Sequence, residues 1–480
     1  MKSALLPLVV DLDGTLIRTD LLAETASSFV IGQPHRVLAL LGWFAGGRSN
    51  LKARLAASTR IDVATLPYNE ALLRWLRDQK AEGRWIVLAT ASHRLLADRV
   101  ADHLELFDEV HATEGSTNLK GDAKRDALVQ RYGERGFDYV GNDWPDLSVW
   151  GSAQQAHVVN GSVRLIDRNR GHGNLGFTID EGRLSAGAAL LAAMRPHQWM
   201  KNLLVFIPLL AAHGYSSAAA VFASLLAFVA FGLAASSAYL LNDLVDVGDD
   251  RHHERKRHRP FAAGDLGLLH GWMAWPVLLS AAILLGGLLL PWQFAACLCL
   301  YVVLTTAYSL RLKQVAVVDA LTLAALYTLR IMAGAAAIGV PPSFWLLAFS
   351  MFIFLSLAFI KRYSELRAAR DASRDAALRG RGYSPQDLEL ISSLGGSAGY
   401  MAVLVLALYI QDSHTAALYA QPRFIWLACP LLLYWISRAW LIAHRGRMHD
   451  DPIVFALRDR VSWIVAVLFI AVFVLARLAT

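Results

Sequence analysis

Residues 239–250 read YLLNDLVDVGDD, so a long apolar run ends here in a cluster of acidic residues. If the helix continues past Leu241, then Asp243, Asp246 and Asp250 stand at spacings i, i+3 and i+7 and share one face. Like charges at such spacings destabilise a bare helix, but a divalent cation among them removes that cost. Mg²⁺ takes oxygen ligands and commonly bridges carboxylates to substrate phosphates. The stretch therefore predicts a magnesium–diphosphate site at a helix end.

A basic segment follows directly, since residues 251–260 read RHHERKRHRP. Guanidinium groups such as that of Arg259 suit phosphate oxygens. An ordinary basic loop beside a membrane would explain this charge equally well, but it would not explain the spaced aspartates before it. Three histidines in the segment raise the alternative of a zinc site, which the neighbouring Arg and Lys residues disfavour because they repel a cation.

The composition indicates a membrane protein. The chain has 480 residues, of which 55% are hydrophobic and 18% charged, against roughly 25% charged in a typical soluble protein. The net charge of +7 fits loops on the cytoplasmic side of a membrane better than nucleic-acid binding. Each apolar segment is near the ~20 residues that a bilayer core requires, although the first is short. Nine are expected, at residues 203–213, 219–241, 272–290, 293–310, 316–338, 343–360, 394–410, 423–443 and 461–478.

The loops between these segments set an orientation. The joins at 242–271, 311–315, 361–393 and 444–460 carry 5, 2, 7 and 4 Lys or Arg residues, and the alternating joins carry none. Basic loops stay in the cytoplasm. We therefore expect the acidic helix end and the chain before residue 190 to be cytoplasmic, and the C-terminus to lie outside.

The N-terminal part has the pattern of a soluble α/β domain. Residues 8–10 form an apolar strand that runs into Asp11 and Asp13, whose alternation points both carboxylates the same way. Residues 85–90 form a second strand that ends in Thr90, Lys124 lies where a helix begins, and a third strand leads into Asp143 and Asp146. Strands separated by helical stretches predict a parallel sheet with crossover helices.

These motifs resemble, in order, the four motifs of the haloacid dehalogenase (HAD) superfamily. The resemblance implies a phosphatase in which Asp11 is the nucleophile, Asp13 the general acid/base, and Thr90 and Lys124 hold the phosphoryl oxygens. It also implies Mg²⁺ bound by the acidic motifs, and a helical cap over the site between residues 17 and 80. The implied metal ligands are Asp11, Asp13, Asp143 and Asp146.

One motif departs from this pattern. HAD proteins usually have Gly-Asp where this chain has Gly141-Asn142, and Asp143 is one position late. A domain kept only for folding or membrane-side contact is the alternative that this departure raises. We expect the domain at residues 1–160, a linker rich in Gly and Arg at 161–190, and the membrane domain at 191–480.

The pattern Asn-Asp-x-x-Asp-x-x-x-Asp in a multi-span protein resembles the UbiA superfamily of intramembrane prenyltransferases, over roughly residues 190–480. The resemblance implies an all-helical domain that uses Mg²⁺ to bind and ionise a diphosphate, with Asp243 and Asp246 as catalytic ligands and Asp250 as a further metal ligand. Asn242 is implied to hydrogen-bond the substrate or to complete the metal shell.

The other inner loops resemble the branch that contains decaprenyl-phosphate phosphoribosyltransferases. They include residues 195–202 and 308–313, the stretch from Lys361-Arg362 to Arg379-Gly380-Arg381-Gly382-Tyr383, and Asp450-Asp451-Pro452. The implied reaction transfers 5-phosphoribose from phosphoribosyl diphosphate (PRPP) to a polyprenyl phosphate in the bilayer. The expected phosphate-binding residues are Lys201, Arg259, Lys313, Lys361 and Arg362.

Three functional hypotheses stay open. In the first, the membrane domain transfers phosphoribose and the HAD domain removes the 5-phosphate of the product. In the second, the membrane domain is an aromatic prenyltransferase that uses a polyprenyl diphosphate. In the third, the chain is a lipid-phosphate transporter with a regulatory or inactive HAD domain. The transporter is disfavoured because no inverted repeat is evident and the aspartates lie at a helix end.

Overall fold

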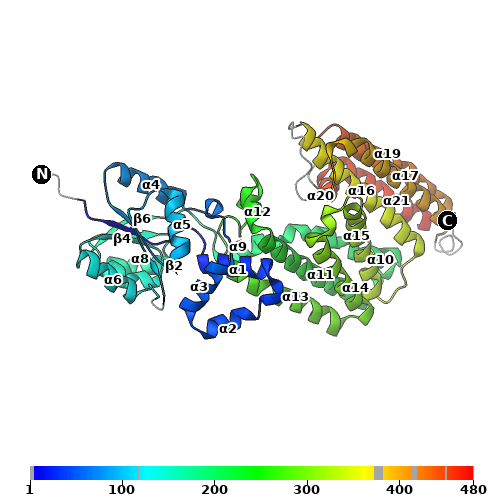
Figure 1. Ribbon diagram of the computed structural model, residues 1–480. Helices are drawn as coiled ribbons and strands as arrows, with labels where there is room; N and C mark the ends of the chain where they lie inside the picture. Colours follow the sequence, from blue (N-terminus) through cyan, green and yellow to red (C-terminus); the bar gives the residue numbers. More distant parts are fainter. Residues whose placement is uncertain (1–4, 116–117, 372–381, 412–418, 449–450, 479–480) are drawn as a thin grey trace. The chain divides into compact units, whose positions relative to one another are not determined.

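The structure is a computed structural model that describes residues 5–115, 118–371, 382–411, 419–448 and 451–478 (Figure 1). The chain forms two compact units. The first consists of residues 1–195 with 239–276, and the second of residues 196–238 with 277–480. The acidic stretch that opens the sequence analysis therefore belongs to the same unit as the N-terminal domain.

The first unit is built on a six-stranded sheet of order β3-β2-β1-β4-β5-β6. All of its pairings are parallel, and β1 lies between β2 and β4. Asp11 directly follows the central strand, so it lies at the carboxyl edge where open α/β sheets bind ligands. This confirms the predicted parallel sheet. The strands are β1 (Leu8–Val10), β2 (Ile86–His93), β3 (Glu109–Thr113), β4 (Asp138–Gly141), β5 (Ala156–Val159) and β6 (Leu175–Ile179).

Helices cover both faces of the sheet. Leu8 and Val10 of β1 pack on one face with apolar residues of α4 and α5, whereas Val9 packs on the other face with residues of α6, α7 and α8. This alternation explains why β1 is apolar at every position. The helices of this unit are α1 (Leu21–Gly32), α2 (Ala39–Ala45), α3 (Arg48–Ser58), α4 (Glu70–Ala81), α5 (Arg94–Leu104), α6 (Asp122–Tyr132), α7 (Leu147–Ser152), α8 (Val163–Arg170), α9 (Ala186–Met194) and α12 (Val247–His252).

The segment expected as a linker, residues 161–190, is folded. It contains α8, whose Leu165 is buried against the sheet, and β6, which pairs with β5 as the sixth strand. The alternation within the short strand Leu175–Ile179 is hidden among glycines and charged residues, so the composition alone suggests a loop. The sheet therefore extends beyond the expected boundary at residue 160.

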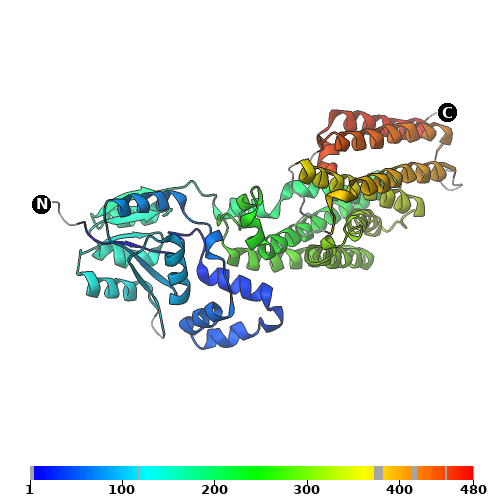
Figure 2. The same cartoon turned by 45° about the horizontal axis from the view of Figure 1, so that its top comes forward.

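The second unit is helical, and eight helices in the described residues are long and apolar enough to cross a membrane. Neighbouring pairs include α16 with α17 and α19 with α21, which Figure 2 shows side by side. The chain is an integral membrane protein. The spans are α11 (Ala218–Val245), α13 (Leu268–Leu289), α14 (Trp292–Leu310), α15 (Val318–Ala337) and α16 (Phe344–Asp371), then α17 (Leu388–Gln411), α19 (Ala428–His444) and α21 (Arg460–Leu478), with the short α20 (Pro452–Arg458) before the last.

The first of the nine expected spans is not a long helix. The chain there forms a 3-10 helix over Pro196–Phe206 and then a short α-helix, α10 (Ile207–Ala211). Pro208 lies in the first turn of α10, where a missing N–H is tolerated but no hydrogen bond can be made to the preceding turn. The other eight expected segments coincide with the eight spans.

Glycines allow close packing between helices of the second unit. A Cβ on Gly334 of α15 would lie 2.1 Å from the backbone oxygen of Val205 in the 3-10 helix. A Cβ on Gly395 of α17 would lie 2.2 Å from the Trp440 ring. Small residues of this kind let helices approach closely where lipid gives no hydrophobic driving force between them.

Candidate active sites

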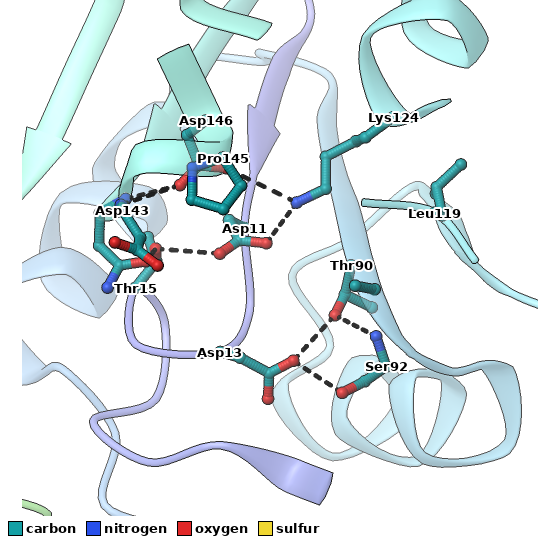
Figure 3. A network of polar contacts seen from close by, with 12 residues as sticks. Asp11, Asp13, Thr15, Thr90, Ser92, Leu119, Lys124, Asp143, Pro145 and Asp146 are labelled. Atoms are coloured by element: carbon teal, nitrogen blue, oxygen red, sulfur yellow. Dashed lines mark hydrogen bonds and ion pairs between the residues drawn. The ribbon is translucent and has the colours of Figure 1, made fainter. Parts of the chain in front are cut away.

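The side chain that follows β1 forms a buried ion pair. Nζ of Lys124, in the first turns of α6, donates to Oδ1 of Asp11 at 2.6 Å and to the hydroxyl of Tyr139 at 3.0 Å (Figure 3). Burial raises the pKa of Asp11 to about 6, although Lys124 opposes that shift. The ammonium of Lys124 stays charged because Asp11 and Asp146 raise its pKa against the effect of burial. The arrangement offers a carboxylate nucleophile beside a fixed cation.

Asp13 is held from two directions. Its Oδ1 accepts from the backbone N–H of Leu21, at the start of α1, at 2.8 Å. Its Oδ2 accepts from the hydroxyls of Ser92 at 2.7 Å and Thr90 at 3.3 Å (Figure 3). Burial raises the pKa of Asp13 to about 7, which suits a group that exchanges protons near neutral pH. Ser92 was missed by the sequence reasoning, because only the turn of the chain after Thr90 brings it to Asp13.

The acidic motif after β4 is arranged differently from the expectation. Asp146 accepts from the Tyr139 hydroxyl at 2.8 Å and from the backbone N–H groups of residues 142 and 143. Asp143 caps the following turn by accepting from the N–H of Trp144, and its side chain is exposed. Asn142 instead faces the nucleophile, because its Oδ1 accepts from the hydroxyl of Thr15, which also lies 3.3 Å from Asp11. Asn142 therefore takes the place next to Asp11 that was expected of Asp143.

A cap residue completes this site. Lys52 of α3 donates from Nζ to the backbone oxygen of Ala91 at 2.5 Å and to Oδ1 of Asn118 at 3.0 Å. Burial lowers the pKa of Lys52, and the negative charge of Asp13 opposes that effect. Lys52 is thus a second cation at the carboxyl edge of the sheet. Its sequence position in a basic helix far from the four motifs gave no signal of this role.

The acidic helix end is interrupted where the expectation had a continuous helix. α11 ends at Val245, and Asp246 is the N-cap of α12. Asp243 and Asp250 are both buried and both accept from Nη1 of Arg259, at 3.1 and 2.6 Å. Arg195 adds a guanidinium nitrogen 2.6–2.7 Å from both oxygens of Asp243. Two of the three aspartates therefore share a basic environment, as the spacing predicted.

Asp246 has different neighbours. Its Oδ2 accepts from the amide of Asn242 at 3.0 Å. Across the parts of the chain that the structure describes, no three His, Cys, Asp or Glu side chains are grouped to hold a metal ion. The predicted metal face of three aspartates is therefore not assembled here. The reason is the turn at Asp246 together with the arginines that occupy the carboxylates of its neighbours.

The remaining expected cations belong to the second unit. Lys201 is paired with Asp451, and the fully buried Arg362 is paired with Asp319 and Glu365. Lys361 precedes Arg362 in α16, and Lys313 lies in a 3-10 turn after α14. The placement of these groups with respect to Asp243 stays a prediction. Arg379, Gly380, Arg381 and Asp450 lie outside the described residues.

Known proteins share the membrane part of this sequence. The profile of the UbiA prenyltransferase family matches residues 203–463. The chain belongs to the UbiA prenyltransferase family. The acidic stretch at the end of α11 lies within the matched residues, so this UbiA protein carries its family motif in the unit that also contains the HAD-like sheet.

Three relatives of this UbiA protein extend the comparison. An uncharacterised protein, y4nM, of Sinorhizobium fredii is 37% identical and is covered over 91% of its length by 98% of this chain. The nodulation protein NoeC of Azorhizobium caulinodans is 42% identical over 56% of this chain and 86% of its own length. Decaprenyl-phosphate phosphoribosyltransferase of Mycobacterium tuberculosis is 32% identical over 59% of this chain and 92% of its own length.

Solved structures resemble each part of the chain. A UbiA homologue from Archaeoglobus fulgidus bound to DMAPP and Mg²⁺ is 16% identical and covers 60% of this chain and 98% of its own, with a TM-score of 0.45. A substrate-bound phosphoserine phosphatase is 14% identical and covers 37% of this chain and 94% of its own, with a TM-score of 0.27.

Both candidate sites have donors that fit Mg²⁺. In the HAD-like site, Asp11 and Asn142 offer oxygens beside Thr15, and oxygen is the ligand that Mg²⁺ prefers. In the UbiA motif, Oδ1 of Asp250 is buried and accepts no hydrogen bond within the described part of the chain. Burial raises the pKa of Asp250, and Arg259 opposes that effect. An unsatisfied buried carboxylate oxygen is a position that a cation would satisfy.

Proposed function

We propose that this UbiA protein transfers 5-phosphoribose from PRPP to a polyprenyl phosphate. The observation that carries the proposal is the pair Asp243 and Asp250, which share the guanidinium of Arg259 and lie in the family motif. The similarity to decaprenyl-phosphate phosphoribosyltransferase over 92% of that protein's length supports this donor and acceptor. Asp243, Asp246 and Asp250 would hold Mg²⁺, with Asn242 beside them. Mg²⁺, when bound, neutralises charge on a leaving diphosphate.

The chain's own cations take part in the proposed reaction. Arg259 and Arg195 already contact Asp243, so both lie within reach of an anion that binds beside that carboxylate. Guanidinium groups stabilise the charge that develops on a departing phosphate. Lys201, Lys313, Lys361 and Arg362 are proposed to bind the remaining phosphates, and the isoprenoid tail is proposed to lie among the spans.

The test supplies the purified protein in nanodiscs with PRPP, Mg²⁺ and decaprenyl phosphate. Mass spectrometry of the extracted lipids is expected to detect a phosphoribosylated product. Asp243→Asn should lower its rate at least about a hundredfold, a typical cost for loss of transition-state charge stabilisation. Asp249→Asn is the matched control, because Asp249 is exposed in the same stretch. If the enzyme instead consumes a polyprenyl diphosphate and an aromatic acid, this proposal is wrong.

The HAD-like site is proposed to act next on that product as a phosphatase. Transfer from PRPP leaves a 5-phosphate on the lipid-linked ribose, and its removal requires a phosphate-monoester hydrolase. Asp11 would accept the phosphoryl group, Asp13 would exchange the proton, and Thr90, Lys124 and Lys52 would neutralise the phosphoryl oxygens. Asp11, Asn142 and Asp146 would hold or orient Mg²⁺. We place this site in the cytoplasm, because the basic loops predict that side for it.

Asp11→Asn separates the two activities. The variant should still form the phosphoribosylated lipid, but the product should keep its 5-phosphate, which adds one phosphate to its mass. Asp122→Asn is the control, since Asp122 is an exposed acid at the start of α6. If Asp11→Asn leaves the phosphate content of the product unchanged, the coupled phosphatase role fails while the transferase proposal stands.

A further inference from the structure

One helix of the cap presents an apolar face to its surroundings. Residues 37–45 read VLALLGWFA and contain no charged or hydrogen-bonding side chain except the Trp43 indole. Within α2 and the residue before it, Leu38 is 78% exposed, Leu41 70% and Phe44 58%. Their spacing of three residues places them along one side of the helix. A surface helix of a soluble domain carries polar residues on this side, so the exposed face requires a partner.

The flanks of this helix are basic. No Asp or Glu occurs between Gln33 and Ser58, whereas Arg36, Arg48, Lys52 and Arg54 do. Arg36, Arg48 and Arg54 are exposed. An apolar face bordered by Arg and Lys is the pattern of helices that lie in the headgroup region of an anionic membrane. An acidic or neutral protein partner would explain the charge, but not the three large aliphatic and aromatic side chains at once.

The helix lies beside the beginning of a membrane span. Val37 and Leu40 of the cap line a cavity of about 400 Å³ together with Leu269, Trp272 and Trp275 of α13. These are residues of the same unit. The indole N–H of Trp272 also donates to Ser27 of α1 at 3.1 Å. Tryptophans at the start of a span mark the membrane–water interface, so the cap is at the level of that interface.

A buried ion pair fixes the cap to this position. Arg251 of α12 donates from both guanidinium nitrogens to Glu24 of α1, at 2.6 and 3.2 Å, and both side chains are buried. The hydroxyl of Thr19 donates to the same carboxylate at 2.7 Å. Since α12 directly follows the span α11, the contact holds α1 close to the end of a membrane helix.

We propose that α2 lies in the surface of the bilayer, with Leu38, Leu41 and Phe44 in the lipid and the flanking arginines at anionic headgroups. The next helix, α3, carries Lys52 into the phosphatase site. The cap therefore connects the membrane surface to the site and would admit phosphate monoesters carried by lipids. This last step rests on the proposed phosphatase function, whereas the membrane contact of α2 does not.

The membrane contact is tested with a nitroxide label in the full chain. Cys297, Cys299 and Cys429 are first replaced by Ser, and the protein is reconstituted in nanodiscs of equal parts phosphatidylglycerol and phosphatidylcholine. A label at Leu41→Cys should be relaxed by oxygen and protected from a water-soluble nickel complex. A label at Arg77→Cys, exposed on α4, should show the opposite. Equal nickel access at both positions overturns the proposal. Protection of Leu41→Cys from both reagents also overturns it, because a second copy or another protein would then cover α2.

The consequence for the substrate is tested by replacing Leu38, Leu41 and Phe44 together with Ser. Hydrolysis of a lipid-linked phosphate monoester in vesicles should fall at least about fivefold, while hydrolysis of p-nitrophenyl phosphate should stay unchanged. Equal loss toward both substrates, or toward neither, overturns the role of α2 in lipid access. If the unsubstituted protein hydrolyses neither compound, the proposed phosphatase function fails, and the label experiment still decides whether α2 contacts lipid.

Discussion

The side-chain oxygen of Asn142 accepts a hydrogen bond from the hydroxyl of Thr15 at 3.1 Å. This contact places a neutral amide beside the nucleophile Asp11, where an acidic residue was expected. A Cβ on Gly14 would lie 2.4 Å from the Asn142 amide nitrogen, so the amide is packed closely against the loop after β1. Asn142 therefore decides how much negative charge this site offers to a cation.

Asn142→Asp should strengthen Mg²⁺ binding at the phosphatase site. One added charge at about 4 Å from a cation is worth several kcal/mol at an effective dielectric constant of ~20. We expect the Mg²⁺ concentration for half-maximal phosphatase activity to fall at least about tenfold. Asp143→Asn is the control and should leave it nearly unchanged, because Asp143 is exposed and caps the turn at Trp144. A larger effect from Asp143→Asn would return the metal-binding role to that residue.

His157 should make the first unit sensitive to acid. Burial, with a smaller contribution from Arg84, lowers its pKa from 6.5 to about 4, and its ring stacks on Phe177 at 4.1 Å. The unfolded chain takes up a proton as the pH falls below about 6.5, and the folded chain does so only near 4. Stability is therefore present above about pH 6.5 and is lost between 6.5 and 4, by about 2–3 kcal/mol.

Thermal unfolding of the wild type and of His157→Gln across this pH range checks the prediction. Other acids also titrate here, so the difference between the two curves isolates His157. That difference should grow in favour of the variant as the pH falls. Parallel curves would mean that His157 is protonated in the folded protein at the same pH as in the unfolded one.

The ion pair between Glu24 and Arg251 should stabilise the first unit strongly. Glu24→Gln leaves a buried guanidinium without its counter-charge, which typically costs about 3–5 kcal/mol. The comparison is Asp167→Asn, which breaks the exposed pair with Arg170 and should cost under about 1 kcal/mol. Limited proteolysis of the full chain in nanodiscs measures the change, and similar resistance in the two variants would contradict the buried role.

Gly334→Ala should destabilise the membrane unit. The added Cβ would meet the backbone oxygen of Val205, which cannot move aside as a side chain can. We expect a loss of about 1–3 kcal/mol, read as a lower temperature of half-maximal aggregation in detergent. Gly396→Ala in α17 is the matched control, since a Cβ there meets no atom within 4 Å. Equal behaviour of the two variants would show that α15 and the 3-10 helix can separate freely.

The sequence predicted the residues that follow sheet strands better than those that tertiary packing brings in. Asp11, Asp13 and Thr90 follow strands at one sheet edge, and Lys124 begins a helix, so their meeting depends only on the parallel topology. Ser92 and Lys52 reach the same site through a turn and through the cap. Neither arrangement has a local pattern, so neither residue could be found from spacing alone.

The membrane part shows the same division. Eight spans are apolar over a full helix length and were predicted at the observed places. Residues 203–213 are equally apolar, but the chain there is a 3-10 helix followed by a short α-helix. The acid spacing predicted that Asp243 and Asp250 lie together. It did not predict that Arg195 and Arg259 pair with them, because these cations come from before α11 and after α12.

The pairing of Asp243 and Asp250 with Arg195 and Arg259 makes this cluster a closed set of two negative and two positive charges. A metal ion cannot simply be added to such a set, because it would approach carboxylates that are already neutralised. A cation and a polyanion that enter together would instead exchange partners with it, the cation taking the aspartates and the polyanion the arginines. The motif is thus arranged to reward simultaneous arrival, so that metal affinity should rise steeply once the diphosphate is present.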